Sequence, residues 1–86
     1  MEALTHTPRK DAFSAIEQER DYQDRKWGVK TNSVPAWILF MEHHLQTARA
    51  AVTTQPNDTT ALNEIRKVTA LGVACMEEHG APPRIG

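Results

Sequence analysis

Two short segments carry the residue types most able to do chemistry in this chain. They are Met41-Glu42-His43-His44-Leu45-Gln46 and Glu64-Ile65-Arg66-Lys67. Both look like helix motifs that bind a divalent metal ion, but most of the expected carboxylates are missing. Mg²⁺ is a hard ion that prefers oxygen ligands, so His43 is a poor ligand and Gln46 offers only a neutral oxygen. The two segments therefore predict a site at which metal binding is impaired.

Composition bounds the kind of protein that can hold these segments. The chain has 86 residues, of which 40% are hydrophobic and 24% charged, and its formal net charge is −1. One small domain of cytoplasmic type is expected, and residues 1–11 lack the apolar region of a secretory signal. Because a domain of roughly 60 residues buries only about 60% of the surface of its unfolded chain, we also expect self-association.

The same composition argues against several partners. No apolar run approaches the roughly 20 residues of a membrane helix, so no membrane span is expected. Lys and Arg are scattered along the chain, so we expect no binding to duplex nucleic acid, which requires clustered cations. The single cysteine, Cys75, cannot form an intramolecular disulfide, and its place in an apolar stripe suggests a small core residue.

Helices must position the two motifs. The first helix is expected over residues 8–26, with Thr7 as its N-cap, Pro8 in its first position and Gly28 after its end. No segment shows the two-residue alternation of a half-buried strand. We therefore predict an all-α fold with a single domain over residues 1–86. It consists of a three-helix unit, an N-terminal helix plus a helical hairpin, that assembles into an oligomeric helical bundle.

The hairpin is expected over residues 35–54 and 58–79, followed by a flexible tail at 81–86. Its caps are Asn32 or Ser33 for the second helix and Asn57 or Asp58 for the third. The run from Ala70 to Ala74 is small enough for close helix approach and suggests an oligomer seam. Three- and four-residue spacing predicts the core faces, which consist of Trp37, Met41, His44, Ala48 and Ala51 in the second helix and Leu62, Ile65, Val68, Thr69, Gly72, Cys75 and Met76 in the third.

Three stretches carry a family resemblance: Glu19-Arg20-Asp21-Tyr22-Gln23-Asp24-Arg25-Lys26-Trp27-Gly28, Trp37-Ile38-Leu39-Phe40-Met41-Glu42, and Glu64 through Gly80. They look like MazG-like nucleotide pyrophosphohydrolases, closest to the small phage and prophage members, over roughly residues 13–84. The resemblance implies an all-α protein that forms dimers or tetramers. It also implies magnesium bound through a Glu-Glu-x-x-Glu motif and a Glu-x-x-Asp motif, and cleavage of a nucleoside triphosphate to monophosphate and pyrophosphate.

Transferred to this chain, the metal motifs are incomplete. The first falls on Glu42, His43 and Gln46, and the second on Glu64 and Lys67, so only Glu42 and Glu64 keep a carboxylate. An ammonium at position 67 would repel a divalent ion but can pair with a phosphate directly. If the hairpin brings Glu42 and Glu64 together, one of them is expected to titrate high or to need a cation.

These observations leave three hypotheses open. The leading one is a nucleotide-binding protein that binds or sequesters a nucleotide or nucleotide-derived signal without a certain cofactor. The second is a Mg-dependent nucleoside triphosphate pyrophosphohydrolase that uses Glu42, Glu64 and a further carboxylate such as Glu17 or Glu78. The third is a helical protein-interaction module. The residues expected to bind the ligand in the first hypothesis are Trp27, Tyr22, Lys26, Arg66 and Lys67.

Several of these residues also have ordinary structural interpretations. His44 lies on the predicted core face, where a hydrogen-bonded histidine is commoner than a metal ligand. His43 points about 100° away from it and is expected to face solvent. Trp27 can fasten the first helix to the hairpin instead of stacking on a base. Lys26 can take part in a surface ion pair.

Overall fold

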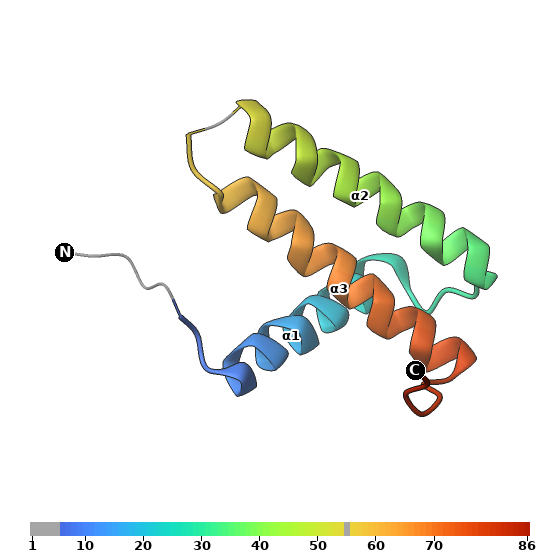
Figure 1. Ribbon diagram of the computed structural model, residues 1–86. Helices are drawn as coiled ribbons and strands as arrows, with labels where there is room; N and C mark the ends of the chain where they lie inside the picture. The colour runs from blue at the N-terminus through green and yellow to red at the C-terminus, as the bar shows by residue number, and fades with distance from the viewer. Residues whose placement is uncertain (1–5, 55) are drawn as a thin grey trace.

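Three helices form the protein in a computed structural model that describes residues 6–54 and 56–86. They are α1 (Arg9–Trp27), α2 (Val34–Thr54) and α3 (Thr59–His79), and no strand occurs within those two ranges. Helices α2 and α3 lie side by side as an antiparallel hairpin, and α1 crosses α3 (Figure 1). The all-α prediction is confirmed, and each helix lies within one residue of its predicted bounds.

The start of α1 differs from the prediction. Pro8, with φ −55° and ψ 144°, is itself the N-cap, and its carbonyl accepts hydrogen bonds from the amides of Asp11 and Ala12 at 2.9 and 3.1 Å. Thr7 is therefore not the cap. Proline suits the cap because this position needs a carbonyl acceptor and a non-helical ψ, and neither requires an amide proton. At the other end, Gly28 terminates α1 as predicted, with φ +75°, a region that favours glycine.

The hairpin begins and ends at predicted signals. Ser33 Oγ accepts a hydrogen bond from the amide of Ala36 at 3.2 Å. Of the two predicted caps of α2, Asn32 and Ser33, the structure therefore selects Ser33. Asp58 precedes α3, and its carbonyl accepts the amide of Leu62 at 2.9 Å, but its side chain makes no capping bond. Gly80 ends α3 with φ +106°.

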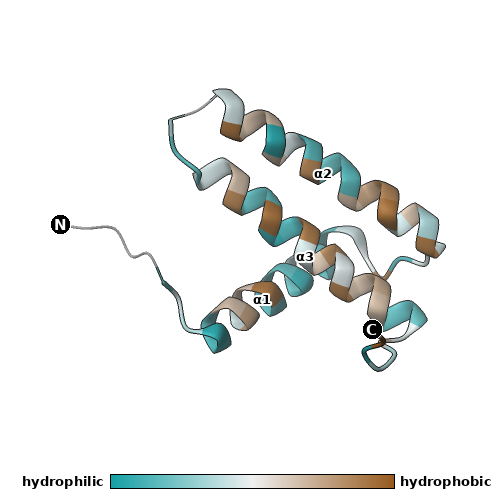
Figure 2. Ribbon diagram, in the orientation of Figure 1, coloured by the Kyte–Doolittle hydropathy of each residue, from teal (hydrophilic) through white to brown (hydrophobic). Residues whose placement is uncertain are grey.

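The core is narrow and consists mostly of small residues. Trp37 is 5% exposed and is the only large apolar side chain that is buried among the described residues; the others are Ala48, Ala51, Ala61, Ala70 and Ala74. The expectation that Leu62, Ile65 and Met76 belong to the core is wrong, because they are 62%, 47% and 48% exposed. They lie on a side of α3 that neither α1 nor α2 covers, so apolar colour also occurs on open faces of the hairpin in Figure 2.

The small-residue run of α3 has a role within the chain. A Cβ atom added at Gly72 would lie 3.8 Å from Met41 Sδ of α2, which is an ordinary van der Waals distance, so Gly72 faces α2 inside the same chain. Ala70 and Ala74 are buried without any second copy of the chain. The predicted oligomer seam at 70–74 is therefore corrected: its buried members serve packing inside one chain. Over the described residues, no helix combines the length and apolar character needed to cross a membrane.

Candidate functional site

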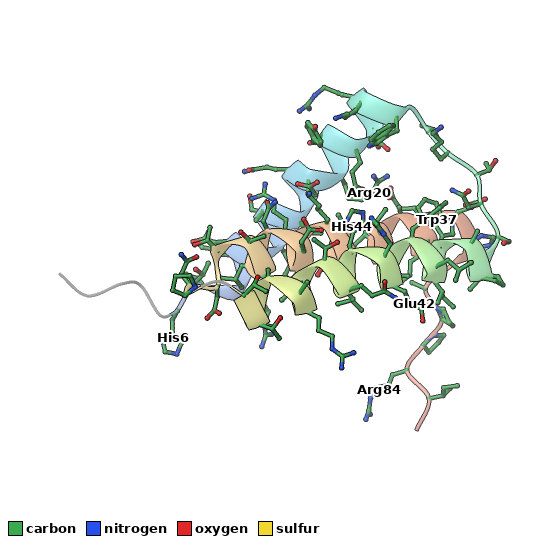
Figure 3. All side chains as sticks on the ribbon, turned by 90° about the horizontal axis from the view of Figure 1, so that it is seen from above. His6, Arg20, Trp37, Glu42, His44 and Arg84 are labelled. Carbon is green, nitrogen blue, oxygen red and sulfur yellow. The ribbon has the colours of Figure 1, made fainter. Side chains whose placement is uncertain are left out.

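An open cavity of about 820 Å³ lies between the C-terminal half of α1, the α1–α2 loop and the hairpin. It forms because α1 packs against α3 alone, which leaves a gap between α1 and α2. In Figure 3, Arg20, Trp37 and His44 point toward this gap, whereas Glu42 points to the other side of α2. The volume lies within the range of about 300–1,000 Å³ that is typical of small-molecule sites.

Aromatic side chains line the cavity from both walls. Tyr22 and Trp27 come from α1 and are 46% and 58% exposed, and Phe40 of α2 is 45% exposed. Lys26 Nζ lies 5.2 Å from the ring centroid of Trp27 and 5.7 Å from that of Tyr22, and it donates a hydrogen bond to Tyr22 Oη at 3.3 Å. The arrangement places one cation over two accessible π faces, so stacking and charge are available side by side.

Arg20 fixes α1 to α3 at the edge of the cavity. Its guanidinium donates to Glu77 Oε1 at 2.7 Å, to Asp24 Oδ1 at 3.0 Å and to Gln23 Oε1 at 3.2 Å. Burial disfavours the charged guanidinium, but hydrogen bonds to Glu77 and Asp24 outweigh burial and raise the pKa of Arg20. All these carboxylates are thus occupied by the protein's own cation.

Glu64 lies at the bottom of a charged cluster between α2 and α3. This side chain is buried, and its two oxygens bind His44 Nδ1 at 2.8 Å and Lys67 Nζ at 3.1 Å. Burial raises the pKa of Glu64, but the hydrogen bonds from His44 and Lys67 together lower it below its usual value. His44 is therefore a histidine hydrogen-bonded within the fold, as its ordinary structural interpretation predicted. It also lines the cavity.

Glu78 holds the α1–α2 loop against the end of α3. Its carboxylate accepts the backbone amide of Asn32 at 3.0 Å and the indole N–H of Trp37 at 2.8 Å. The hydrogen bonds from the Asn32 amide and the Trp37 indole lower the pKa of Glu78. His79 Nε2 lies 2.7 Å from the carbonyl oxygen of Asn32, so a second contact fixes the same loop residue. We refer to these contacts of Glu78 and His79 as the loop clasp.

The structure brings together three of the five predicted ligand-binding residues. Tyr22, Lys26 and Trp27 form one wall of the cavity. Lys67 also lines the cavity, but its ammonium already pairs with Glu64. Arg66 does not line it: Glu19 Oε1 lies 3.2 Å from Arg66 Nε, and this buried nitrogen has no hydrogen bond of good geometry.

Among the lining residues that sequence reasoning missed, Lys30 and Phe40 bear most directly on ligand binding. Lys30 lies on its loop wall and, with Lys26, is one of two lining cations in the described chain that pair with no carboxylate. Phe40 adds the third accessible ring. A signal for Lys30 was present, because Gly28 ends α1 and the following residues must cross toward α2 beside Trp27. The sequence did not show that this crossing forms a wall.

The structure does not bring the two motif carboxylates, Glu42 and Glu64, together at one site. Glu42 is exposed and does not line the cavity, and Glu64 is bound to His44 and Lys67. The expected high titration does not apply to Glu64, whose pKa is lowered because its neighbours are cationic donors and not a second carboxylate. Within residues 6–54 and 56–86, no three His, Cys, Asp or Glu side chains converge in a way that could hold a metal ion.

Comparison with known proteins adds no assignment to this site. No family model, no curated protein sequence and no solved structure matches the chain.

Proposed function

We propose that the chain binds a nucleotide or nucleotide-derived small molecule in the cavity between α1 and the hairpin, without a metal ion, and that it binds or sequesters the molecule unchanged. The observation that carries the proposal is the wall of Tyr22, Lys26 and Trp27, in which exposed rings and an ammonium free of carboxylates lie side by side. The MazG-like resemblance of the sequence supports the same class of ligand.

Base recognition in this proposal depends on the rings. Trp27 and Tyr22 lie on α1 and Phe40 lies on α2, so a planar base that enters the cavity meets aromatic faces from both walls. Stacking of one base on one aromatic side chain contributes about 1–3 kcal/mol as judged by alanine substitution. Two such contacts would supply a substantial part of a micromolar affinity, which corresponds to roughly 8 kcal/mol.

Phosphate recognition depends on Lys26 and Lys30. The other lining cations are neutralised, since Arg20 pairs with Glu77 and Asp24, and Lys67 pairs with Glu64. A phosphate placed between the loop and the end of α1 can form charge-assisted hydrogen bonds with both free ammonium groups. These ion pairs also partly neutralise the carboxylates of Asp24, Glu77 and Glu64, which reduces their repulsion of a phosphate.

Binding is favoured over hydrolysis because the carboxylates are engaged elsewhere. Hydrolysis assisted by magnesium needs ligands that hold the ion near the scissile phosphate. Glu64 is held by His44 and Lys67, Glu78 by Asn32 and Trp37, and Glu42 lies outside the cavity. The donor set therefore supports direct contact between phosphate and lysine.

Isothermal titration calorimetry in the presence of EDTA tests the proposal. The ligands are a panel of nucleoside mono-, di- and triphosphates and of linear and cyclic dinucleotides. At least one is expected to bind, and Trp27→Ala is expected to weaken it by roughly 5- to 150-fold, the equivalent of one stacking contact. Lys30→Gln should weaken it as well, whereas Lys10→Gln, an exposed lysine of α1 outside the cavity, should not.

Two results would overturn the proposal. Flat titrations with every ligand would remove nucleotide binding. Release of pyrophosphate from a nucleoside triphosphate with Mg²⁺, abolished in Glu42→Gln, would replace the binding protein by the pyrophosphohydrolase. We expect no pyrophosphate above that of a buffer blank.

A further inference from the structure

The flank of the hairpin opposite the cavity is apolar and uncovered. On α2 it presents Ile38, Leu45 and Val52, which are 47%, 49% and 51% exposed. These residues are spaced by seven, so they form one stripe along the helix. On α3 Leu62, Ile65 and Met76 are also exposed, and their intervals of three and eleven residues return to the same side of a helix. We call these six residues the apolar flank.

The two rows of the apolar flank lie next to each other. Met41 of α2 and Gly72 of α3 meet between them, at 3.8 Å from Met41 Sδ to a Cβ built on Gly72. The antiparallel course of the helices then places Ile38 near the level of Met76, and Val52 near the level of Leu62. The rows therefore make one continuous surface and not two separate stripes.

We propose that a second copy of this chain covers the apolar flank, with α2 packed antiparallel to α2 of the partner about a two-fold axis at Leu45. The spacing is self-complementary about that residue. Ile38 precedes Leu45 by seven positions and Val52 follows it by seven. A two-fold axis at Leu45 therefore places Ile38 opposite the partner's Val52, and Leu45 opposite the partner's Leu45.

Charges at the edge of the stripe match the same axis. Glu42 and Arg49 lie on α2 about one turn before and one turn after Leu45, and Figure 3 shows Glu42 pointing away from the cavity. Neither forms an ion pair with another described residue. The axis brings Glu42 beside the partner's Arg49 and Arg49 beside the partner's Glu42. A parallel arrangement would place each residue level with its own copy and leave Glu42 about 10 Å along the helix from the partner's Arg49, so the pairs favour the antiparallel one.

The size of the flank fits a stable pair of helical hairpins. A 21-residue helix such as α2 or α3 is about 30 Å long, and packed helices lie about 8–10 Å apart. Two adjacent helices thus offer a plane of roughly 600 Å² before the relief of their side chains is added. A standard interface buries about 800 Å² on each partner. Few large side chains are buried within one chain, so this area is also where further apolar burial is available.

Sedimentation equilibrium and light scattering over a concentration series test the dimer. The full chain should have the mass of two 9.7 kDa chains at micromolar concentration. Leu45→Lys should weaken association at least about 100-fold, because it places two ammonium groups on the axis and removes two apolar contacts. Circular dichroism should show unchanged helicity, since position 45 is half exposed. Phe13→Lys, a matched change on exposed α1, should leave association unchanged.

A charge swap tests the antiparallel arrangement. Glu42→Arg and Arg49→Glu should each weaken the dimer severalfold, and the double variant Glu42→Arg/Arg49→Glu should restore it. A chain that stays monomeric at high concentration would overturn the proposal and leave the flank to another partner. A dimer that is insensitive to Leu45→Lys, or a double variant as weak as the single ones, would overturn this interface. The proposed nucleotide site lies on the opposite side of the hairpin, so failure of the dimer would leave the calorimetric test of nucleotide binding unaffected.

Discussion

The two flanks of the α2–α3 hairpin carry side chains of different chemistry. The cavity flank carries charged and aromatic side chains that are tied to one another through Arg20, Glu64 and Glu78. The apolar flank carries aliphatic side chains and no ion pair within the described chain. The difference teaches that the chain ties its polar groups together around a cavity and leaves its aliphatic groups exposed, where the proposed dimer would form. Substitutions should therefore alter folding on the first flank and association on the second.

The largest effect is expected at Trp37, where the cavity flank meets the core. Trp37→Ala should lower the free energy of unfolding by about 3–5 kcal/mol, because it removes a buried ring and leaves Glu78 without its indole donor. Urea denaturation followed by circular dichroism measures this. Leu45→Ala, measured at a dilution at which dimers dissociate, should cost less than about 1 kcal/mol. Equal costs at the two positions would break the contrast between the flanks.

The next effect concerns the buried carboxylate. Glu64→Ala should lower the free energy of unfolding by about 1–3 kcal/mol, since it leaves His44 and Lys67 without their shared acceptor. Glu17→Ala, an exposed carboxylate of α1, should change it by no more than about 0.5 kcal/mol. Thermal or chemical denaturation of both variants compares them. A Glu64→Ala chain as stable as the Glu17 variant would show that the cluster adds no stability.

A smaller effect is expected where α1 ends and the loop wall begins. Gly28→Ala should cost about 1–2 kcal/mol, because the combination of φ +75° and ψ 175° lies in a region that is essentially restricted to glycine. No atom lies within 4 Å of the added Cβ, so the cost is conformational and not steric. Gly86→Ala, at a positive φ in the tail, serves as the control and should have no measurable effect. Urea denaturation of the two variants measures both costs.

The pH dependence gives the smallest and most specific test. The pKa of Glu64 is lower in the folded chain than the ordinary value of 4.5, so the folded state favours its ionised form. This stability is fully present above about pH 4.5 and is lost as the pH falls through the folded pKa. Melting temperatures between pH 7 and pH 3 should fall less steeply in Glu64→Gln than in the natural chain. Glu78, whose pKa is also lowered, should supply part of the slope that remains.

Local signals in the sequence predicted the helices well. Gly28 and Gly80 end helices at positive φ, and Ser33 caps α2, because each of these effects depends on a few adjacent residues. Thr7 failed as a cap because Pro8 took that position. The apolar spacing of α3 was recognised, but it could not tell which part of a wide stripe the other helices would cover. That choice depends on where α1 crosses α3.

The candidate site was only partly predictable. Tyr22, Lys26 and Trp27 are close in sequence, so their clustering on one helix end followed from helical geometry. The ion pair of Arg66 with Glu19 joins α3 to α1, so it depends on how these helices pack and could not be read from spacing. The ion pair of Lys67 with Glu64 is an i,i+3 pair within α3, so the sequence already offered a partner for this ammonium. Lys30 was missed because its loop becomes a wall only through the clasp at Glu78.

The loop clasp has a consequence for the order in which the protein becomes competent during synthesis. The ribosome delivers residues 28–32 about 46 positions before the carboxylate that fastens Asn32. Until the final turn of α3 has emerged, the nascent chain can form α1 and α2 but cannot close the wall between them. The cavity that we propose as a ligand site is therefore complete only after the residues of the final turn of α3 have emerged.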